Sequence, residues 1–272
     1  MKLSKALQGF ELYLNARRYS EATLSDYRTA LRKAVVFLDD PVVEKVTRHD
    51  LERFMAWLAT EYQPAKRAGT DWRLSNKTLK NHWIAIRSFY NWAERDLNIA
   101  RPDEKLEPPE VSSPDIQPFN EDEIVAILQN IDFSKQAATA GRASFRMALP
   151  DAARNRAIVL TLLDTGMRVS ELTRLNIEDV DLEQGQITLH PHRSGRKTRG
   201  RTVFIGRKAR MANWKLISES GAAVGPLFVN RSTGERLTRS GIQSSLDRIE
   251  GASGVANIYP HRFRHTFAIQ YL

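Results

Sequence analysis

Apolar residues recur at three- and four-residue spacing through most of the first hundred residues, and this is the period of an amphipathic helix. The spacing restarts after an early turn, with Thr23 as the expected cap, again after Thr47, and again near Ser75 or Asn76. Short polar side chains at these points can accept hydrogen bonds from the first free amides of a helix. We therefore predict a four-helix unit over residues 1–100.

A stretch without this period follows. Residues 101–118, RPDEKLEPPEVSSPDIQP, contain five prolines, which stiffen the backbone and exclude a regular helix. We predict an extended linker here and a second domain over residues 119–272. Asn120 and Glu123 have the spacing of a capping box, so this domain is expected to open with a helix.

The second domain mixes helical and strand patterns. From Ala153 to Leu163 apolar residues cover most of a helix surface, and Gly166 follows where a left-handed residue would end the helix. Two short β-prone runs then flank a turn rich in glycine and arginine, which predicts a hairpin. The predicted fold class is mainly α with a small antiparallel β-hairpin sheet. The strands are expected at Ile187–Leu189 and Val203–Ile205, and later helices at Arg207–Glu219, at Ser240–Glu250 and from Pro260.

The charge balance indicates which class of partner the protein binds. The 272 residues include 41 Lys and Arg against 32 Asp and Glu, a net charge of +9, which favours a polyanion such as nucleic acid. The positive charge lies at both ends, with 17 basic and 12 acidic residues over 1–100 and 15 and 4 over 191–272. The chain has no cysteine, no secretory signal and no membrane-spanning run, so a cytoplasmic protein is expected.

The first stretch with candidate functional residues is TGMRVSEL, residues 165–172. Arg168 follows the turn at Gly166, and Glu171 lies one helical turn later, where its carboxylate could hold the guanidinium. An arginine after a helix is more commonly a solvated charge, and the local pattern alone leaves that alternative open.

A second candidate stretch, HRFRHTFA, covers residues 261–268. Pro260 suits the first position of a helix, which would place His261 and Arg264 on one face. Phe263 and Phe267 would lie on another face and anchor the helix in the core. We therefore expect the face with His261 and Arg264 to contribute to a functional site, and the face with the two phenylalanines to pack in the core.

These two stretches resemble the first and second arginine boxes of the tyrosine recombinase, or phage integrase, family, in the family's order. YSEATLSDYRTAL and LSNKTLKNHWIAIRSFYNWA resemble its SAM-like core-binding domain. The resemblance, which is Xer-like, implies a SAM-like DNA-binding domain at 1–100 and a catalytic domain at 119–272. It also implies site-specific recombination through a 3′-phosphotyrosine intermediate, without a metal or another cofactor.

The resemblance assigns roles to individual residues. Arg168 and Arg264 would bind the scissile phosphate, and His261 would assist proton transfer. The leaving 5′ oxygen would be protonated by a hairpin lysine, for which Lys197 is the candidate, although Arg196 stands where a simple alignment places the lysine. Glu171 is expected to orient neighbouring groups, and His265 to pack or support the site.

The family's nucleophile is a tyrosine that follows a later Gly-His motif. No such motif follows His265, and Tyr259 and Tyr271 are better explained as core or interface residues. The sequence is therefore expected to represent a recombinase without its C-terminal end, which binds DNA without cleaving it. A non-catalytic DNA-binding regulator of recombination sites is the main alternative, and a type IB topoisomerase a more distant one.

The expected partners are double-stranded DNA and further copies of the chain, four in a synaptic complex by family, with no membrane involved. Eight basic residues and no acidic one occur between Arg193 and Arg210, so the hairpin is either a solvated tip or a contact to the DNA backbone. The candidate DNA contacts are Lys77, Lys80, Arg87, Arg193, Arg196, Arg199 and Arg201.

Overall fold

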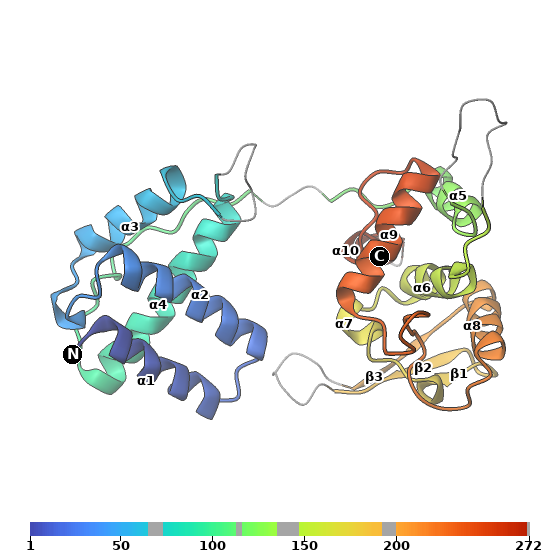
Figure 1. Ribbon diagram of the computed structural model, residues 1–272, viewed down its shortest axis with the longest axis horizontal. Helices are drawn as coiled ribbons and strands as arrows, with labels where there is room; N and C mark the ends of the chain where they lie inside the picture. Colours follow the sequence, from blue (N-terminus) through green and yellow to red (C-terminus); the bar gives the residue numbers. More distant parts are fainter. Residues whose placement is uncertain (65–72, 113–115, 135–146, 192–199, 271–272) are drawn as a thin grey trace. The chain divides into compact units, whose positions relative to one another are not determined.

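The computed structural model describes residues 1–64, 73–112, 116–134, 147–191 and 200–270 (Figure 1). The chain divides into two compact units. The described residues of the first lie within Met1–Pro114, and those of the second within Asp115–Pro191 and Thr198–Leu272. Across the described parts of the chain, no helix is long and apolar enough to cross a membrane.

The first unit contains the four helices that its periodicity predicts, and three of them pack on the last (Figure 1). Thr47 and Asp50 form a reciprocal capping box, and the Ser75 side chain accepts from the Thr78 amide. The second helix is capped by Ser20 and not by Thr23, whose amide donates to the Ser20 hydroxyl. The elements are α1 Leu3–Ala16, α2 Glu21–Phe37, the 3-10 turn η1 Val43–Lys45, α3 Arg48–Thr60 and α4 Asn76–Leu97.

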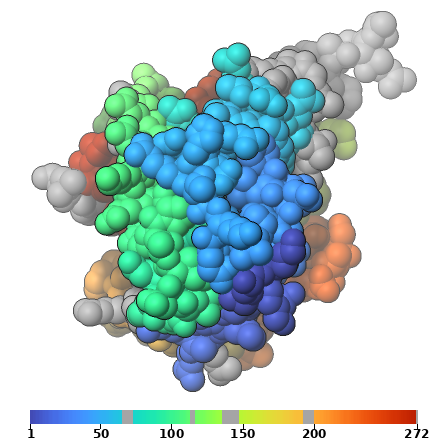
Figure 2. All heavy atoms as spheres, turned by 90° about the vertical axis from the view of Figure 1, so that its left-hand side faces the viewer, coloured from blue at the N-terminus to red at the C-terminus, as the bar shows by residue number. Residues whose placement is uncertain are grey.

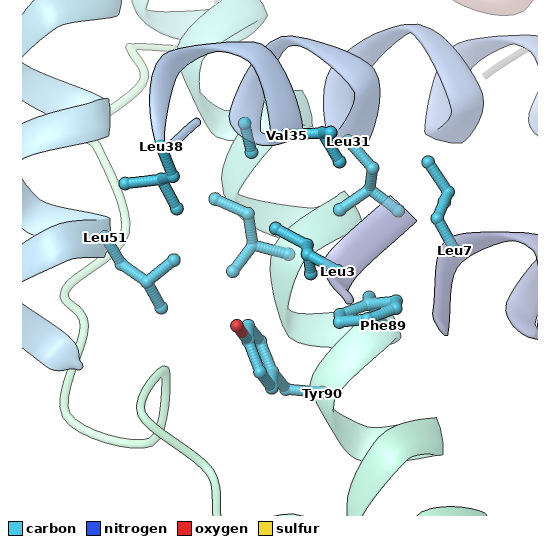
Figure 3. A pocket seen from close by; sticks show the side chains of 10 residues that line it. Leu3, Leu7, Leu31, Val35, Leu38, Leu51, Phe89 and Tyr90 are labelled. Atoms are coloured by element: carbon cyan, nitrogen blue, oxygen red, sulfur yellow. The ribbon is translucent and has the colours of Figure 1, made fainter. Parts of the chain in front are cut away.

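Aromatic and aliphatic side chains fill the interior of this unit. The Phe10 ring meets Phe89 edge-on, with 5.6 Å between ring centroids, and Phe54 is fully buried. Figure 3 shows a small gap between Leu3, Leu31 and neighbouring side chains of α1–α4. Its volume is about 10 Å³ and its lining is apolar, so it is a packing defect rather than a ligand site.

Residues 101–110, the first part of the predicted linker, pack against the first unit. Leu106 is buried in the core of the first unit, and its carbonyl accepts from the Trp83 indole at 2.8 Å. The Glu110 carbonyl accepts from the Asn76 side chain at 2.9 Å. In Figure 2 the green atoms, which include those of α4 as well as this segment, adjoin the blue helices. Residues 101–110 therefore belong to the first unit, to which the buried Leu106 and these two hydrogen bonds attach them.

The second unit is mainly helical with one small sheet, as predicted. Three antiparallel strands lie in the order β1-β2-β3, and Ile187 is opposite Val203. The short first strand was not predicted, because two residues carry no readable alternation. The elements are α5 Glu121–Asn130, α6 Ala152–Thr165, α7 Val169–Leu172, the 3-10 turn η2 Ile177–Asp179, β1 Val180–Asp181, β2 Gln186–Leu189, β3 Arg201–Phe204, α8 Arg207–Ser220, α9 Arg239–Ser253 and α10 Pro260–Gln270.

Helix α6 is the centre of this unit. Its residues Ile158, Val159 and Leu162 are almost completely buried, and it packs against α8, α10 and β3 (Figure 1). The Asn120–Glu123 capping box opens α5 as predicted. A helix buried on most of its surface gives the turns at its end a fixed position, and the candidate site is built there.

Candidate active site

The turn after α6 brings two distant stretches together. Gly166 ends the helix with φ +54°, a left-handed conformation that glycine adopts without strain. A Cβ placed there would lie 2.5 Å from the Phe267 ring of α10. Gly166 therefore lets α10 approach the end of α6. Phe267 lies half-buried beside this turn, whereas the sequence predicted that it would pack in the core with Phe263.

Glu171 is the hub of the polar contacts at this turn. Its buried carboxylate accepts from the Arg168 backbone amide at 2.8 Å, which caps α7. Both Glu171 oxygens also accept from the Arg201 fork, at 2.8 and 2.9 Å. The Arg168 guanidinium, the partner expected from the sequence, makes only one longer contact, at 3.4 Å. Glu171 therefore fixes the backbone of Arg168 more firmly than its side chain.

The electrostatics of Glu171 follow from these contacts. Burial by itself raises its pKa, but the hydrogen bonds from Arg201 and the Arg168 amide, with the charges of both arginines, outweigh burial. The net result is a pKa of about 2, well below the usual value. Glu171 is ionised throughout the physiological range.

Arg264 comes to the same place from α10. Its guanidinium donates to the Gly166 carbonyl at 2.6 Å and is partly buried. Burial, followed by the charge of Arg168, lowers its pKa, with a smaller lowering by Arg201, while Glu171 opposes the shift. The charges of Arg168, Arg201 and Glu171 all act on the Arg264 guanidinium, so the first and second arginine stretches of the sequence meet here.

The two histidines of α10 contact each other. The Nε2 atoms of His261 and His265 lie 3.1 Å apart, and the rings meet edge to face. His261 is exposed, and His265 is partly covered. A hydrogen bond between these two atoms requires complementary tautomers, with a proton on one Nε2 and a free lone pair on the other, so each ring constrains the tautomer of its neighbour.

An open groove adjoins the arginines. Asp164 on its wall accepts from the Gly206 amide at 2.6 Å, and burial raises the pKa of this carboxyl. Asp164 is not recognisable from the sequence, because an acidic residue at the end of a helix has no distinguishing pattern. The groove is lined by Asp164, Thr165, Gly166, Arg201, Thr202, Val203, Phe204, Arg264, Phe267 and Ala268.

The other predicted site residues lie in three places. Lys77 is exposed and Lys80 half-exposed on α4, and the Arg87 guanidinium stacks over the Trp83 ring at 5.2 Å. Tyr259 precedes α10 and does not line the groove. Lys197, Arg193, Arg196, Arg199 and Tyr271 are outside the described residues.

Arg201 is the one predicted DNA contact of the hairpin that the structure describes. It is the first residue of β3, pairs in register with Leu189 of β2, and binds Glu171. Only its charge signalled a function in the sequence. The carboxylate partner is thirty residues away, and nothing in the local pattern connects the two.

Comparison with known proteins extends to both units. Residues 119–272 match the phage integrase family, and residues 7–96 match the phage integrase N-terminal SAM-like domain. A tyrosine recombinase XerC of Pelobacter propionicus is 29% identical over 280 residues, which cover 99% of this chain and 82% of the relative. A tyrosine recombinase XerD of Oceanobacillus iheyensis is 28% identical over 286 residues, covering 99% and 85%.

Solved structures share the fold. A λ integrase dimer bound to a COC′ core site has a TM-score of 0.70 at 14% identity and covers all of this chain and 90% of that one. XerH recombinase bound to a palindromic difH substrate has a TM-score of 0.64 at 20% identity, covering 90% and 67%. With family matches over both units and two arginine stretches joined at one turn, the chain belongs to the phage integrase family, as a Xer-like tyrosine recombinase.

Proposed function

We propose that this chain binds a specific duplex DNA site and takes part in breaking and rejoining DNA strands there. The observation that carries the proposal is the meeting of Arg168 and Arg264 at the Gly166 turn, beside a carboxylate that is bonded mainly to Arg201. Guanidinium groups whose positive charge is only partly neutralised by nearby carboxylates suit a phosphodiester. Their planar forks match its two non-bridging oxygens.

The proposed reaction is an exchange of phosphate esters. A tyrosine hydroxyl attacks the phosphorus, the bond to the 5′ oxygen breaks, and a 3′-phosphotyrosine remains until the reverse attack rejoins a strand. Arg168 and Arg264 would stabilise the charge that builds on the non-bridging oxygens, each worth about 3 to 4 kcal/mol in the transition state. His261 would move the proton at the tyrosine, and Lys197 would supply one to the leaving oxygen.

These 272 residues alone are proposed to bind without cleaving. The described residues that line the groove include no tyrosine, and Tyr259 lies before α10. Tyr271 follows the second arginine stretch in the sequence, and we propose that it is not the nucleophile. The same observation favours the alternative that the chain occupies recombination sites and regulates a catalytic partner.

DNA would be held by both units. The basic residues of α4, Lys77, Lys80 and Arg87, would contact backbone phosphates from the first unit. The hairpin residues Arg193, Arg196 and Arg199 would do so from the second. λ integrase is known as a tetramer on a Holliday junction, and we propose a homo-oligomer on DNA here too, four copies in the synaptic complex.

The test starts with selection of a binding site from duplexes with a randomised core. The selected site is then given to the chain as a nicked substrate that traps any covalent adduct, which a denaturing gel reveals. We expect a defined site to be enriched and no adduct to form. Arg168→Ala and Arg264→Ala should weaken binding, whereas Arg239→Ala on α9 is the control for loss of one positive charge. Enrichment of no sequence would contradict the proposal, and an adduct would refute the absence of cleavage.

A further inference from the structure

Arg201 and Arg168 share Glu171 unequally. The Arg201 fork meets both carboxylate oxygens at 2.8 and 2.9 Å, whereas Arg168 reaches one oxygen at 3.4 Å. The Glu171 side chain is 3% exposed, and that of Arg168 is 48% exposed. The buried carboxylate is thus satisfied by one arginine, and the other faces solvent.

We propose that Arg201 is a positioning residue that occupies Glu171 and thereby leaves the Arg168 guanidinium available to the substrate phosphate. The inference rests on the proposed function for the identity of that phosphate. It replaces the expectation that Arg201 contacts DNA directly.

The charge balance supports this role. Arg168, Arg201 and Arg264 carry three positive charges, and Glu171 carries one negative charge. A buried carboxylate without a partner is strongly unfavourable, so one arginine must stay with it. If Arg168 were that partner, its fork would be used and the phosphate would meet Arg264 alone. Because Arg201 fills this place, two guanidinium groups remain for one phosphate.

The backbone places Arg201 for the task. It opens β3 and pairs with Leu189, so the sheet fixes the origin of its side chain. Arg168 is also only 3.4 Å from the carboxylate, close enough to replace Arg201 without movement of the backbone. A lysine at position 201 would keep the charge but could not bind both oxygens, because an ammonium group has no planar fork.

A first measurement needs no DNA. Protein labelled with ¹⁵N in its arginine side chains shows whether a guanidinium rotates freely or is held, and Arg168→Lys identifies the Arg168 signals. We expect Arg168 to rotate freely in the wild type, to be held in Arg201→Met, and to rotate freely again in Glu171→Gln/Arg201→Met. A freely rotating Arg168 in Arg201→Met would overturn the inference.

A second measurement uses the selected DNA site. Arg201→Met should weaken DNA binding by about tenfold, because Arg168 would then bind Glu171 and lose its charged hydrogen bonds to the phosphate. Glu171→Gln/Arg201→Met should recover to within about threefold of the wild type, because the glutamine oxygen still caps α7 while no carboxylate holds Arg168. A residue that only braced the fold would not be rescued by a second substitution.

The outcomes separate the explanations. If Arg201 contacts DNA itself, the double variant stays weak and the salt slope falls by about 1, which overturns the inference. Arg210→Met is the matched control, since Arg210 is a partly buried arginine that donates to the Leu182 and Glu183 carbonyls instead of a carboxylate. If Arg210→Met binds the DNA more weakly than the wild type, adding Glu171→Gln should not restore binding. If the wild type selects no DNA, the proposed function fails, and the rotation of Arg168 still decides the inference.

Discussion

At the scale of single residues, the candidate site depends on how one carboxylate is shared. The resemblance of two stretches to the arginine boxes of the family, and not charge or spacing alone, indicates Arg168, His261 and Arg264 in the sequence. It does not identify the partner of Glu171, since Arg201 reaches it only through the pairing of β3 with β2. Contacts made across a fold depend on packing, which residue types alone do not specify.

The lowered pKa of Glu171 predicts a pH-dependent contribution to stability. Its pKa in the folded chain is about 2, against an ordinary value of 4.5. The contribution is therefore fully present above about pH 4.5 and is lost as the pH falls towards 2, with an upper size of about 3 kcal/mol. Denaturant unfolding of the wild type and Glu171→Gln should show a difference that shrinks across this range. A constant difference would mean that Glu171 is not strongly coupled to the arginines.

Gly166 is predicted to tolerate no side chain. Gly166→Ala combines a positive φ with a Cβ 2.5 Å from Phe267, so it should lower the free energy of unfolding by about 2 kcal/mol or more. Gly221→Ala is the matched control, because Gly221 has φ +65° but nothing within 4 Å of the added carbon. It should cost about 1 kcal/mol. Equal losses in the two variants would show that the contact with α10 is unimportant.

At the scale of elements, periodicity predicted the long helices and missed features that depend on few residues. The four helices of the first unit and α6, α8, α9 and α10 follow their apolar spacing, and the caps at Thr47 and Asn120 were correctly placed. The strand β1 is too short to show a pattern. The prolines and charges of residues 101–110 dominate their composition and favour a linker, whereas the burial of Leu106 places these residues in the first unit.

The packing of that segment gives a prediction of its own. Leu106→Ala should destabilise the first unit by about 2 to 4 kcal/mol, because it empties a core position that is 6% exposed. Leu12→Ala removes the same atoms at a position that is 71% exposed and should change the stability little. Thermal unfolding followed by tryptophan fluorescence would report mainly on the first unit, because four of the five tryptophans lie within residues 1–100. Equal effects of the two substitutions would restore the interpretation of residues 101–110 as a linker.

At the scale of the whole molecule, the net charge of +9 and the basic residues of both units favour a polyanion. The distribution of this charge was readable from the sequence, whereas the site itself required the fold. Arg168 and Arg264 are almost a hundred residues apart and meet only because α10 packs on the end of α6. Binding to DNA should weaken steeply with salt, since each phosphate contact releases counterions.

The most direct test of the account replaces single phosphates of the selected DNA site with neutral methylphosphonates, one position at a time. We predict one position at which the replacement weakens binding by the wild-type chain but not by Arg168→Ala/Arg264→Ala, because the two arginines hold that phosphate. Arg239→Ala should respond like the wild type. If every position affects the wild type and the double variant equally, Arg168 and Arg264 do not form a phosphate site, and the central claim is wrong.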